Sequence, residues 1–380
     1  MPPSTLPSLP SLPPLSSLSS LSSLPSLPSL SSLPSLPSLP SLLTLSSLSL
    51  LLACQSPEAT ENRPPVESAV QRFDPRMEVL LPPGVQVERL AAGFDWSEGP
   101  LWLPDHNRLI FSDVPRNRIY QYIPGDSTAT VWLQPSGYTA DRAAEGESGS
   151  NGLALDPQGR LLLCQHGDRR VARMRAPLDD PRPAFETLAA SYQGQRFNSP
   201  NDLCVHRSGA IFFTDPPYGL PGGPDDPSRE LDIQGVYRRD PDGSVTLLID
   251  SLSRPNGIAL SPDQRTLYVA NSDPQAALWM AYALDEAGGL IGGQLLYDAT
   301  QDVGESQPGL PDGLKVDAKG YIWATGPGGV WMFAPEGKLL GRILTGLPTS
   351  NCALAPGYLY LTADSLLLRV RRLQGRGASD

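Results

Sequence analysis

One short pattern recurs along this chain and limits what the chain can fold into. It begins with a polar residue, continues through an apolar run and a turn, and ends in a second apolar run, as in SNGLALDPQGRLLLCQHGD at 150–168. Aligned on the first apolar run, the recurring polar position reads Glu98, Asn151, Asn201, Asn256, Asp312 and Asn351. Every one of these side chains offers an oxygen atom.

The spacing of the repeats selects an architecture. Successive positions are 53, 50, 55, 56 and 39 residues apart, close to the period of roughly 40 to 50 residues that four-stranded propeller blades have. The apolar runs are short and rich in β-branched and aromatic residues, and turns such as DPQG and DPDG separate them. We therefore predict an all-β, six-bladed β-propeller over residues 79–373. The first strand of each blade should line a central channel, where the six oxygens converge.

Charge excludes one class of partner. The chain carries a formal net charge of -11, and residues 1–57 contain no charged residue, so the acidic excess belongs to the rest of the chain. Phosphate binding needs basic patches, which argues against nucleic acid as a partner. A small neutral substrate or a cation fits this balance better. No obligate protein partner is indicated.

The N-terminal region has a composition that cannot build a varied core. Residues 1–53 are low-complexity repeats of Ser, Leu and Pro that end in LLTLSSLSLLLA, directly before Cys54. Leu51 to Cys54 resemble a bacterial lipobox, so we expect a lipoprotein signal, a lipid anchor on Cys54 and a periplasmic location in the cell envelope. No Lys or Arg precedes the apolar stretch, and a cytoplasmic leader is the alternative. Residues 54–78 are interpreted as a flexible tether and residues 374–380 as a disordered tail.

The remaining cysteines do not indicate a metal or redox motif. Cys164, Cys204 and Cys352 lie in or beside apolar strand patterns, and no two cysteines have CxxC spacing. We expect buried free thiols.

The recurring oxygens have two interpretations. Four of the six positions are followed by Gly, and Asn-Gly and Asp-Gly are common turn formers. Asn201 precedes Asp202 and Asn351 precedes Cys352, however, so a turn does not explain the whole set. Carboxylates and carboxamides gathered around an axis would form an oxygen cage suited to a hard cation such as Ca²⁺. Zinc or copper would favour His or Cys ligands, and the chain has only three His.

Residues 79–373 resemble the SMP-30/gluconolactonase/LRE family of six-bladed propellers, particularly its bacterial gluconolactonase branch. The likeness rests on SEGPLW, SNGLALDPQGRLLLCQHGDRRVAR, FNSPNDLCVHRSGAIFFTDPPYGL, GVYRRDPDGSVTLLID, RPNGIALSPD and PDGLKVDAKGYIWATGPGGVWMF. It implies a lactonase that opens a sugar lactone such as gluconolactone to its aldonic acid and depends on Ca²⁺ or another divalent cation. The family's metal ligands fall on Glu98, Asn201, Asn256 and Asp312.

The identity of the general base stays open. The family implicates Asp312 as base or nucleophile, although a metal-bound carboxylate is a weak base. His166 is the competing candidate, because its position at a strand end could bring the imidazole to the channel mouth. A structural histidine is the alternative for that residue. Asn151, Arg196 and Asn351 are candidate substrate contacts, with surface charge as the alternative for Arg196.

Two other functions use features of the same chain. A calcium-dependent phosphotriester or organophosphate hydrolase would employ the same cage to polarise a P=O bond. A non-catalytic sugar-binding lipoprotein would keep the cation and lack the base. The loop 215–219, Asp-Pro-Pro-Tyr-Gly, is interpreted as a rigid wall of the entrance.

Overall fold

The computed structural model describes residues 68–141 and 146–373. These belong to the larger of the chain's two compact units, Thr60–Asp380. The leader 1–53, most of the tether and the tail 374–380 lie outside the described residues. In the described part of the chain, no helix has the length and apolar character needed to cross a membrane.

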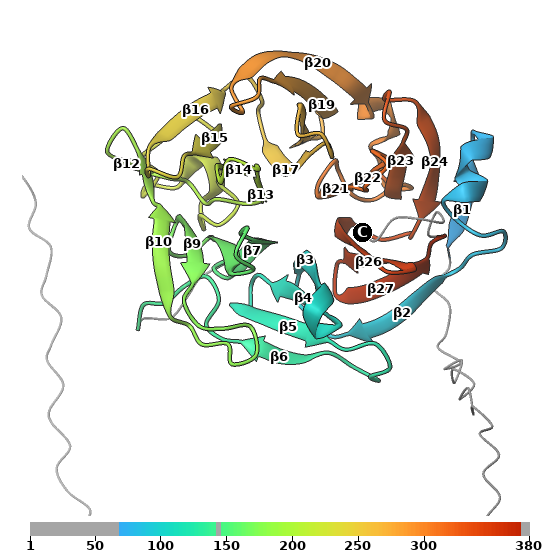
Figure 1. The fold of residues 1–380 in the computed structure, drawn as a ribbon, viewed down its shortest axis with the longest axis horizontal. Coiled ribbons are helices and arrows are strands. Elements are labelled where there is room, and N and C mark those ends of the chain that lie inside the picture. The colour runs from blue at the N-terminus through green and yellow to red at the C-terminus, as the bar shows by residue number, and fades with distance from the viewer. Residues whose placement is uncertain (1–67, 142–145, 374–380) are drawn as a thin grey trace, which may run out of the picture. The chain divides into compact units, whose positions relative to one another are not determined.

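The described residues form six antiparallel blades around a central channel (Figure 1), which confirms the predicted propeller. The first three blades are β3 (Ser97–Leu103), β4 (Arg108–Asp113), β5 (Arg118–Tyr122) and β6 (Thr130–Leu133); β7 (Ser150–Leu155), β8 (Leu161–Gln165), β9 (Arg170–Met174) and β10 (Phe185–Ala189); and β13 (Leu203–Val205), β14 (Ile211–Thr214), β15 (Val236–Arg239) and β16 (Val245–Ile249).

The fourth and fifth blades are β17 (Pro255–Leu260), β18 (Thr266–Asp273), β19 (Ala276–Leu284) and β20 (Leu290–Asp298); and β21 (Leu314–Val316), β22 (Ile322–Gly326), β23 (Gly329–Phe333) and β24 (Leu339–Leu344). The sixth combines β25 (Thr349–Ala355), β26 (Tyr358–Ala363) and β27 (Leu366–Arg371) with β2 (Val87–Ala92). Short pieces outside the blades are the hairpin β11 (Ser191–Tyr192) and β12 (Gln195–Arg196), and the 3₁₀ turns η1 (Pro75–Val79), η2 (Pro104–His106), η3 (Gly223–Asp225) and η4 (Thr300–Asp302).

Apolar side chains fill the spaces between blades. Between the fourth and fifth blades, Trp279 of β19 packs against Trp331 and Phe333 of β23, with ring centroids 5.3 and 5.4 Å apart. Trp279 is almost completely buried. Burying one such ring contributes roughly 1.5 to 3 kcal/mol. Interlocked side chains of this kind hold the inner strands in fixed positions around the channel.

Segments from the N-terminus complete two blades. β2 pairs with β27 and forms the outermost strand of the sixth blade, which closes the ring. β1 (Ala69–Arg72) adds a fifth strand beside β24. The predicted tether 54–78 is therefore wrong from residue 69 onward. The reason is that Met77 is fully buried in the core and Val70 packs against it, so an otherwise polar segment is anchored at two apolar points.

The glycines that follow the recurring polar position are required by close approach between blades rather than by hairpin turns. A Cβ on Gly99 would lie 2.0 Å from the main-chain oxygen of Asn151 in the next blade. A Cβ on Gly257 would lie 2.1 Å from the main-chain oxygen of Asp312. At these two places, the main chain beside one recurring position therefore packs directly on the next recurring position around the ring.

Candidate functional site

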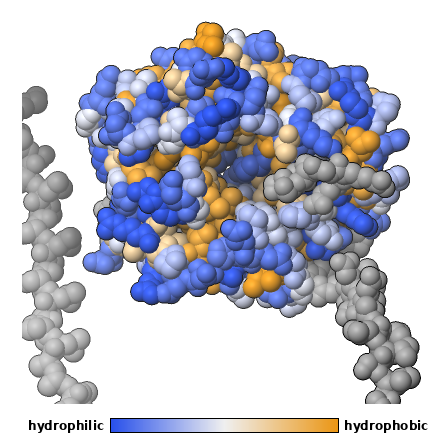
Figure 2. Space-filling view, in the orientation of Figure 1, coloured by the Kyte–Doolittle hydropathy of each residue, from blue (hydrophilic) through white to orange (hydrophobic). Residues whose placement is uncertain are grey.

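A cavity of about 450 Å³ lies where the inner strands meet, a size that ligand sites commonly have. Five of the six recurring side chains line it. Trp96, Pro274, Leu310 and Pro348 add apolar wall. In the face drawn in Figure 2, the surface is hollowed at the centre of the ring. The convergence expected from the repeat is confirmed for Glu98, Asn151, Asn201, Asn256 and Asp312.

Hydroxyl groups on the second strands of the blades bind main-chain carbonyls at or next to the recurring positions. Each lies at or near the end of its strand and donates a hydrogen bond to a carbonyl of the next blade. This tie was not anticipated, although FSD, FTD and NSD at the strand ends signal it in the sequence. The bonds include Ser112 Oγ to the oxygen of Asn151 at 2.9 Å, Thr214 Oγ1 to that of Asn256 at 2.7 Å and Thr325 Oγ1 to that of Ser350 at 2.9 Å.

Asn351, the sixth recurring residue, lies behind the cavity lining. It is almost completely buried, and its Nδ2 donates to Glu98 Oε2 at 3.5 Å. Asn351 is absent from the residues that line the cavity. The expectation that it contacts substrate is therefore not met. Its side chain contacts Glu98 instead.

The surroundings of two cavity carboxyl groups, those of Glu98 and Asp312, oppose ionisation. Glu98 is only 3% exposed, and burial, with Asp202 and Glu147 nearby, raises its pKa to about 8. The pKa of Asp312 is raised well above its usual value by burial and by the carboxyls of Glu98, Asp202 and Glu147. Asp312 is partly exposed, yet its Oδ1 is buried and has no hydrogen-bond partner among the described residues.

These observations fit a divalent cation. A cation would offset the repulsion between Glu98 and Asp312 and would give the unpartnered Oδ1 a partner. Within residues 68–141 and 146–373, no three His, Cys, Asp or Glu side chains gather closely enough to hold a metal ion. Any such site therefore needs neutral oxygen ligands as well, and the carboxamides of Asn201 and Asn256 line the same cavity.

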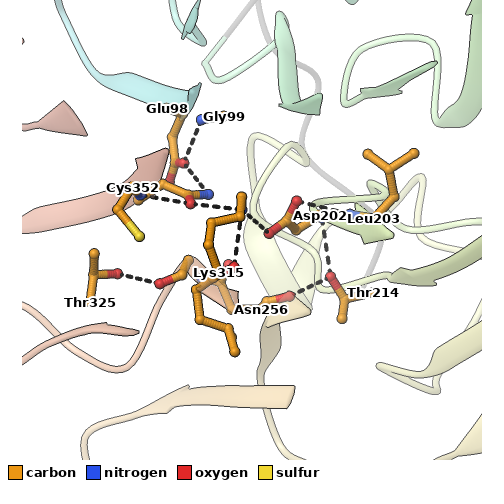
Figure 3. Close-up of polar contacts among 12 residues, drawn as sticks. Glu98, Gly99, Asp202, Leu203, Thr214, Asn256, Lys315, Thr325 and Cys352 are labelled. Carbon is orange, nitrogen blue, oxygen red and sulfur yellow. Dashed lines mark hydrogen bonds and ion pairs between the residues drawn. The ribbon is translucent and has the colours of Figure 1, made fainter. Parts of the chain in front are cut away.

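Asn256 is oriented for this role. Its Nδ2 donates to Ser272 Oγ at 2.9 Å, so the carbonyl oxygen of the amide is the group left for a ligand. Figure 3 draws Asn256 together with Glu98 around the centre of the ring. The amide is thus fixed in the sense that an oxygen ligand requires.

Three cavity residues were not predicted as site residues. Glu147 is half-buried, and burial raises its pKa to about 7. Tyr218 is the one residue of the described loop 215–219 that lines the cavity, and burial raises the pKa of its hydroxyl. Arg254 is exposed at the edge of the cavity. Glu147 and Arg254 precede the recurring motifs by two or more residues, and no sequence pattern marks them.

His166 does not reach the cavity. It is fully buried, and burial lowers the pKa of its imidazole to about 4. Its Nδ1 lies 3.2 Å from the main-chain oxygen of Glu147, and its Nε2 is buried without a hydrogen-bond partner among the described residues. The expectation of an imidazole at the channel mouth is not met, because the loop that carries Gly219 packs directly on the ring.

Arg196 is also placed elsewhere. It belongs to the exposed hairpin strand β12, where its main-chain N–H donates to Glu230 Oε2 at 2.7 Å. It is absent from the cavity lining. The surface-charge alternative fits this position.

The three cysteines of the described residues are free thiols, as expected. Cys164 and Cys352 are buried and Cys204 is half-buried, and all three are free in the described part of the chain.

Residues 96–365 match the family model described as the SMP-30/Gluconolactonase/LRE-like region. The chain belongs to this family. A gluconolactonase of Zymomonas mobilis is 38% identical over 309 residues, which are 80% of this chain and 85% of that protein.

Two further relatives each cover more than 60% of this chain. The pentonolactonase XacC of Haloferax volcanii is 30% identical over 64% of this chain and 72% of that protein. The solved structure of a gluconolactonase from Xanthomonas campestris superposes with a TM-score of 0.67 at 34% identity, covering 81% of this chain and 96% of that one.

Proposed function

We propose that this member of the family hydrolyses a sugar lactone, such as gluconolactone, to its aldonic acid with the help of a divalent cation, calcium in the first instance. One observation carries the proposal: a ligand-sized cavity brings the carboxyl groups of Glu98 and Asp312 together with the carboxamides of Asn201 and Asn256. The similarity to lactonases of two organisms supports the substrate class.

The residues that would hold the cation are Glu98, Asn201, Asn256 and Asp312. When bound, a cation of this kind polarises a carbonyl group and stabilises negative charge on its oxygen. The apolar wall that includes Trp96 and Leu310 would exclude bulk water around the lactone ring and so strengthen these electrostatic interactions.

Asp312 is the proposed general base. Its carboxylate accepts a proton from water while the water oxygen bonds to the carbonyl carbon of the lactone. It then returns the proton to the ring oxygen as the bond between that oxygen and the carbonyl carbon breaks. The product is the open hydroxy acid. Burial and the neighbouring carboxyls raise the pKa of Asp312 in the cation-free protein, and a bound cation would lower it again, so that the group would be an ionised carboxylate able to accept a proton.

Three further residues that line the cavity, Glu147, Tyr218 and Arg254, would orient the substrate. Tyr218 keeps its proton at neutral pH, since burial raises its pKa, and its hydroxyl bonds with the side chain of Ser272. It can therefore donate to a lactone oxygen. Glu147 and Arg254 line the same cavity and offer an acceptor and a donor for sugar hydroxyls.

The test uses the purified protein with gluconolactone and with paraoxon, each with and without chelator. Hydrolysis of the lactone that chelator abolishes and calcium restores supports the proposal. Hydrolysis of paraoxon alone would favour the phosphotriester alternative, and cation binding without turnover of either compound would favour a sugar-binding protein.

Asp312→Asn separates binding from chemistry. The variant keeps an oxygen ligand of similar size and removes the carboxylate. Turnover should fall at least about 10²-fold and should not return at saturating calcium, because a general base is lost. Glu98→Gln makes a comparable change in charge but keeps the proposed base, so at saturating calcium its turnover should stay within about tenfold of wild type. Recovery of Asp312→Asn at high calcium would leave Asp312 a ligand only.

We also propose that Cys54 carries a lipid anchor and that the protein works on the periplasmic side of a bacterial envelope. The support is the lipobox-like run from Leu51 to Cys54 after an apolar stretch. Cys54 lies outside the described residues, so the proposal rests on sequence alone.

A further inference from the structure

A lysine lies among the acidic groups beneath the cavity. Lys315 belongs to β21, three residues after Asp312. Its Nζ lies 3.1 Å from the main-chain oxygen of Leu314, 3.2 Å from Asn351 Oδ1 and 3.9 Å from Asp202 Oδ2. Figure 3 shows the side chain between Asp202 and the group that contains Glu98 and Cys352. Oxygen atoms therefore surround the ammonium group.

Lys315 and the main-chain N–H of Cys352 together set the orientation of the Asn351 amide. Asn351 Oδ1 accepts hydrogen bonds from Lys315 Nζ and from the main-chain N–H of Cys352 at 2.9 Å. A flipped amide would direct its NH₂ at both of these donors, which is unfavourable. The observed sense sends Nδ2 toward Glu98 Oε2 at 3.5 Å. The hydrogen bonds that Oδ1 accepts therefore direct the NH₂ group of the amide toward Glu98.

Glu98 has one other polar contact of this kind. Its Oε2 also accepts from the main-chain N–H of Gly99 at 2.9 Å. The Gly99 contact comes from its own strand, whereas the Asn351 contact comes from β25 of the neighbouring sixth blade. The amide is therefore the link through which other blades can set the position of the carboxyl group.

The carboxyl group of Asp202 gives a reason for a charged side chain at position 315. It is 2% exposed, and its Oδ2 has no hydrogen-bond partner among the described residues. Its Oδ1 accepts the main-chain N–H of Leu203 at 2.9 Å, and a cation a few ångströms from a buried carboxyl group lowers the cost of ionising it. The ammonium group of Lys315 therefore lies between two side chains of other blades. Asp202 comes from the third blade and Asn351 from the sixth.

We propose that Lys315 is a positioning residue that acts through Asn351 to hold the Glu98 carboxyl group in the orientation that catalysis uses. The inference rests on the proposed function, in which Glu98 is a ligand of the cation. Lys315 itself touches neither the cavity nor the substrate. The three residues belong to three different blades, so their contact couples the first, fifth and sixth blades at the site.

The experiment is a double-mutant cycle of Lys315→Met, Asn351→Leu and the double variant, with Lys319→Met as the control. Lys319 lies on a turn of the same blade and is exposed. The first measurement is kcat and KM for gluconolactone at saturating calcium. The second is the dissociation constant for Tb³⁺, followed by its luminescence without substrate.

Each single variant should lower kcat about tenfold and change KM less than about twofold, because misplacement of a group that acts in the transition state lowers kcat. The double variant should match the more impaired single variant within about twofold, in kcat and in the Tb³⁺ constant, because the two residues act in series. Lys319→Met should equal wild type. Wild-type kinetics in Lys315→Met, or effects of the two changes that multiply, would overturn the inference.

Chemical rescue separates positioning from a general loss of folding. Lys315→Cys treated with 2-bromoethylamine restores an ammonium group on a chain of lysine's length, and kcat should return toward wild type. Wild type treated in the same way controls for the native thiols. Complete alkylation without recovery of kcat would contradict the proposed role. Wild-type protein that neither binds Tb³⁺ nor hydrolyses the lactone would instead sink the proposed function, and the positioning role with it.

Discussion

Raising the pH should destabilise the cation-free protein, and Glu98 should account for a defined part of that loss. The carboxyl group is buried, with a pKa raised from 4.5 to about 8. Unfolding exposes it to water and returns the pKa to the ordinary value. Between the two values, the folded protein holds a proton that the unfolded chain has released. Stability from this group is therefore complete below pH 4.5 and is lost as pH rises through 8.

The size of the effect follows from the same two values. In this window each pH unit removes up to about 1.4 kcal/mol of unfolding free energy per group. Between pH 6 and pH 8 the loss attributable to Glu98 is about 2 kcal/mol, because the group is half ionised at the upper end. Glu98 is only 3% exposed, so solvent screening does not reduce this figure much. The pKa values of Glu147 and Asp215 are raised to about 7 and add losses of the same sign.

Urea unfolding in EDTA at pH 6 and pH 8 measures the effect, with Glu98→Gln as the matched variant. The wild type should lose about 2 kcal/mol more than the variant over this interval, since Gln cannot ionise. Calcium should stabilise the wild type more at pH 8 than at pH 6, because its binding competes with the proton. An equal pH dependence in the two proteins would refute the assignment, whatever the total loss.

Three other changes have defined outcomes. Gly257→Ala should lower the unfolding free energy by about 1 to 3 kcal/mol, since its Cβ meets the Asp312 carbonyl, whereas Gly292→Ala, with open space around its Cβ, should have little effect in the same urea titration. His166→Ala should leave turnover within about tenfold of wild type at saturating calcium; a loss of 10² or more with unchanged calcium affinity would return the base assignment to His166. Cys54→Ala should release the protein from the membrane fraction, and recovery of the unaltered protein in the cytosol would contradict the anchor.

The repeat was sufficient to predict the ring and most of its centre. A period-two pattern with a polar residue at the start of each first strand determines which face points inward, and blades in a ring must bring those starts together. Glu98, Asn256 and Asp312 could therefore be assigned to one cavity before any coordinates were known. The same reasoning placed Asn351 in the cavity, because spacing cannot reveal that its side chain is held behind Glu98 by Lys315.

The remaining differences depend on contacts between segments distant in sequence. His166 ends a strand as expected, but the loop at Gly219 covers it, and no local pattern announces that contact. The composition of residues 69–78 is typical of a linker. This segment belongs to the fold because β1 pairs with the edge strand β24 and because Met77 is buried. Arg196 was predicted to contact substrate because a guanidinium group can donate hydrogen bonds. That property does not determine where in the fold the residue lies.

The pairing of β2 with β27 has a consequence for biosynthesis. The register joins Val87 to Val370 and Ala92 to Leu366, so the ring stays open until nearly the whole domain has been synthesised. Until then the apolar side of β2 and the unpaired edge of the sixth blade are both exposed, and such edges favour aggregation. Contacts this distant in sequence also make closure slow. A truncation that ends before β27 should therefore yield an open chain of blades that associates with other copies, rather than a smaller stable propeller.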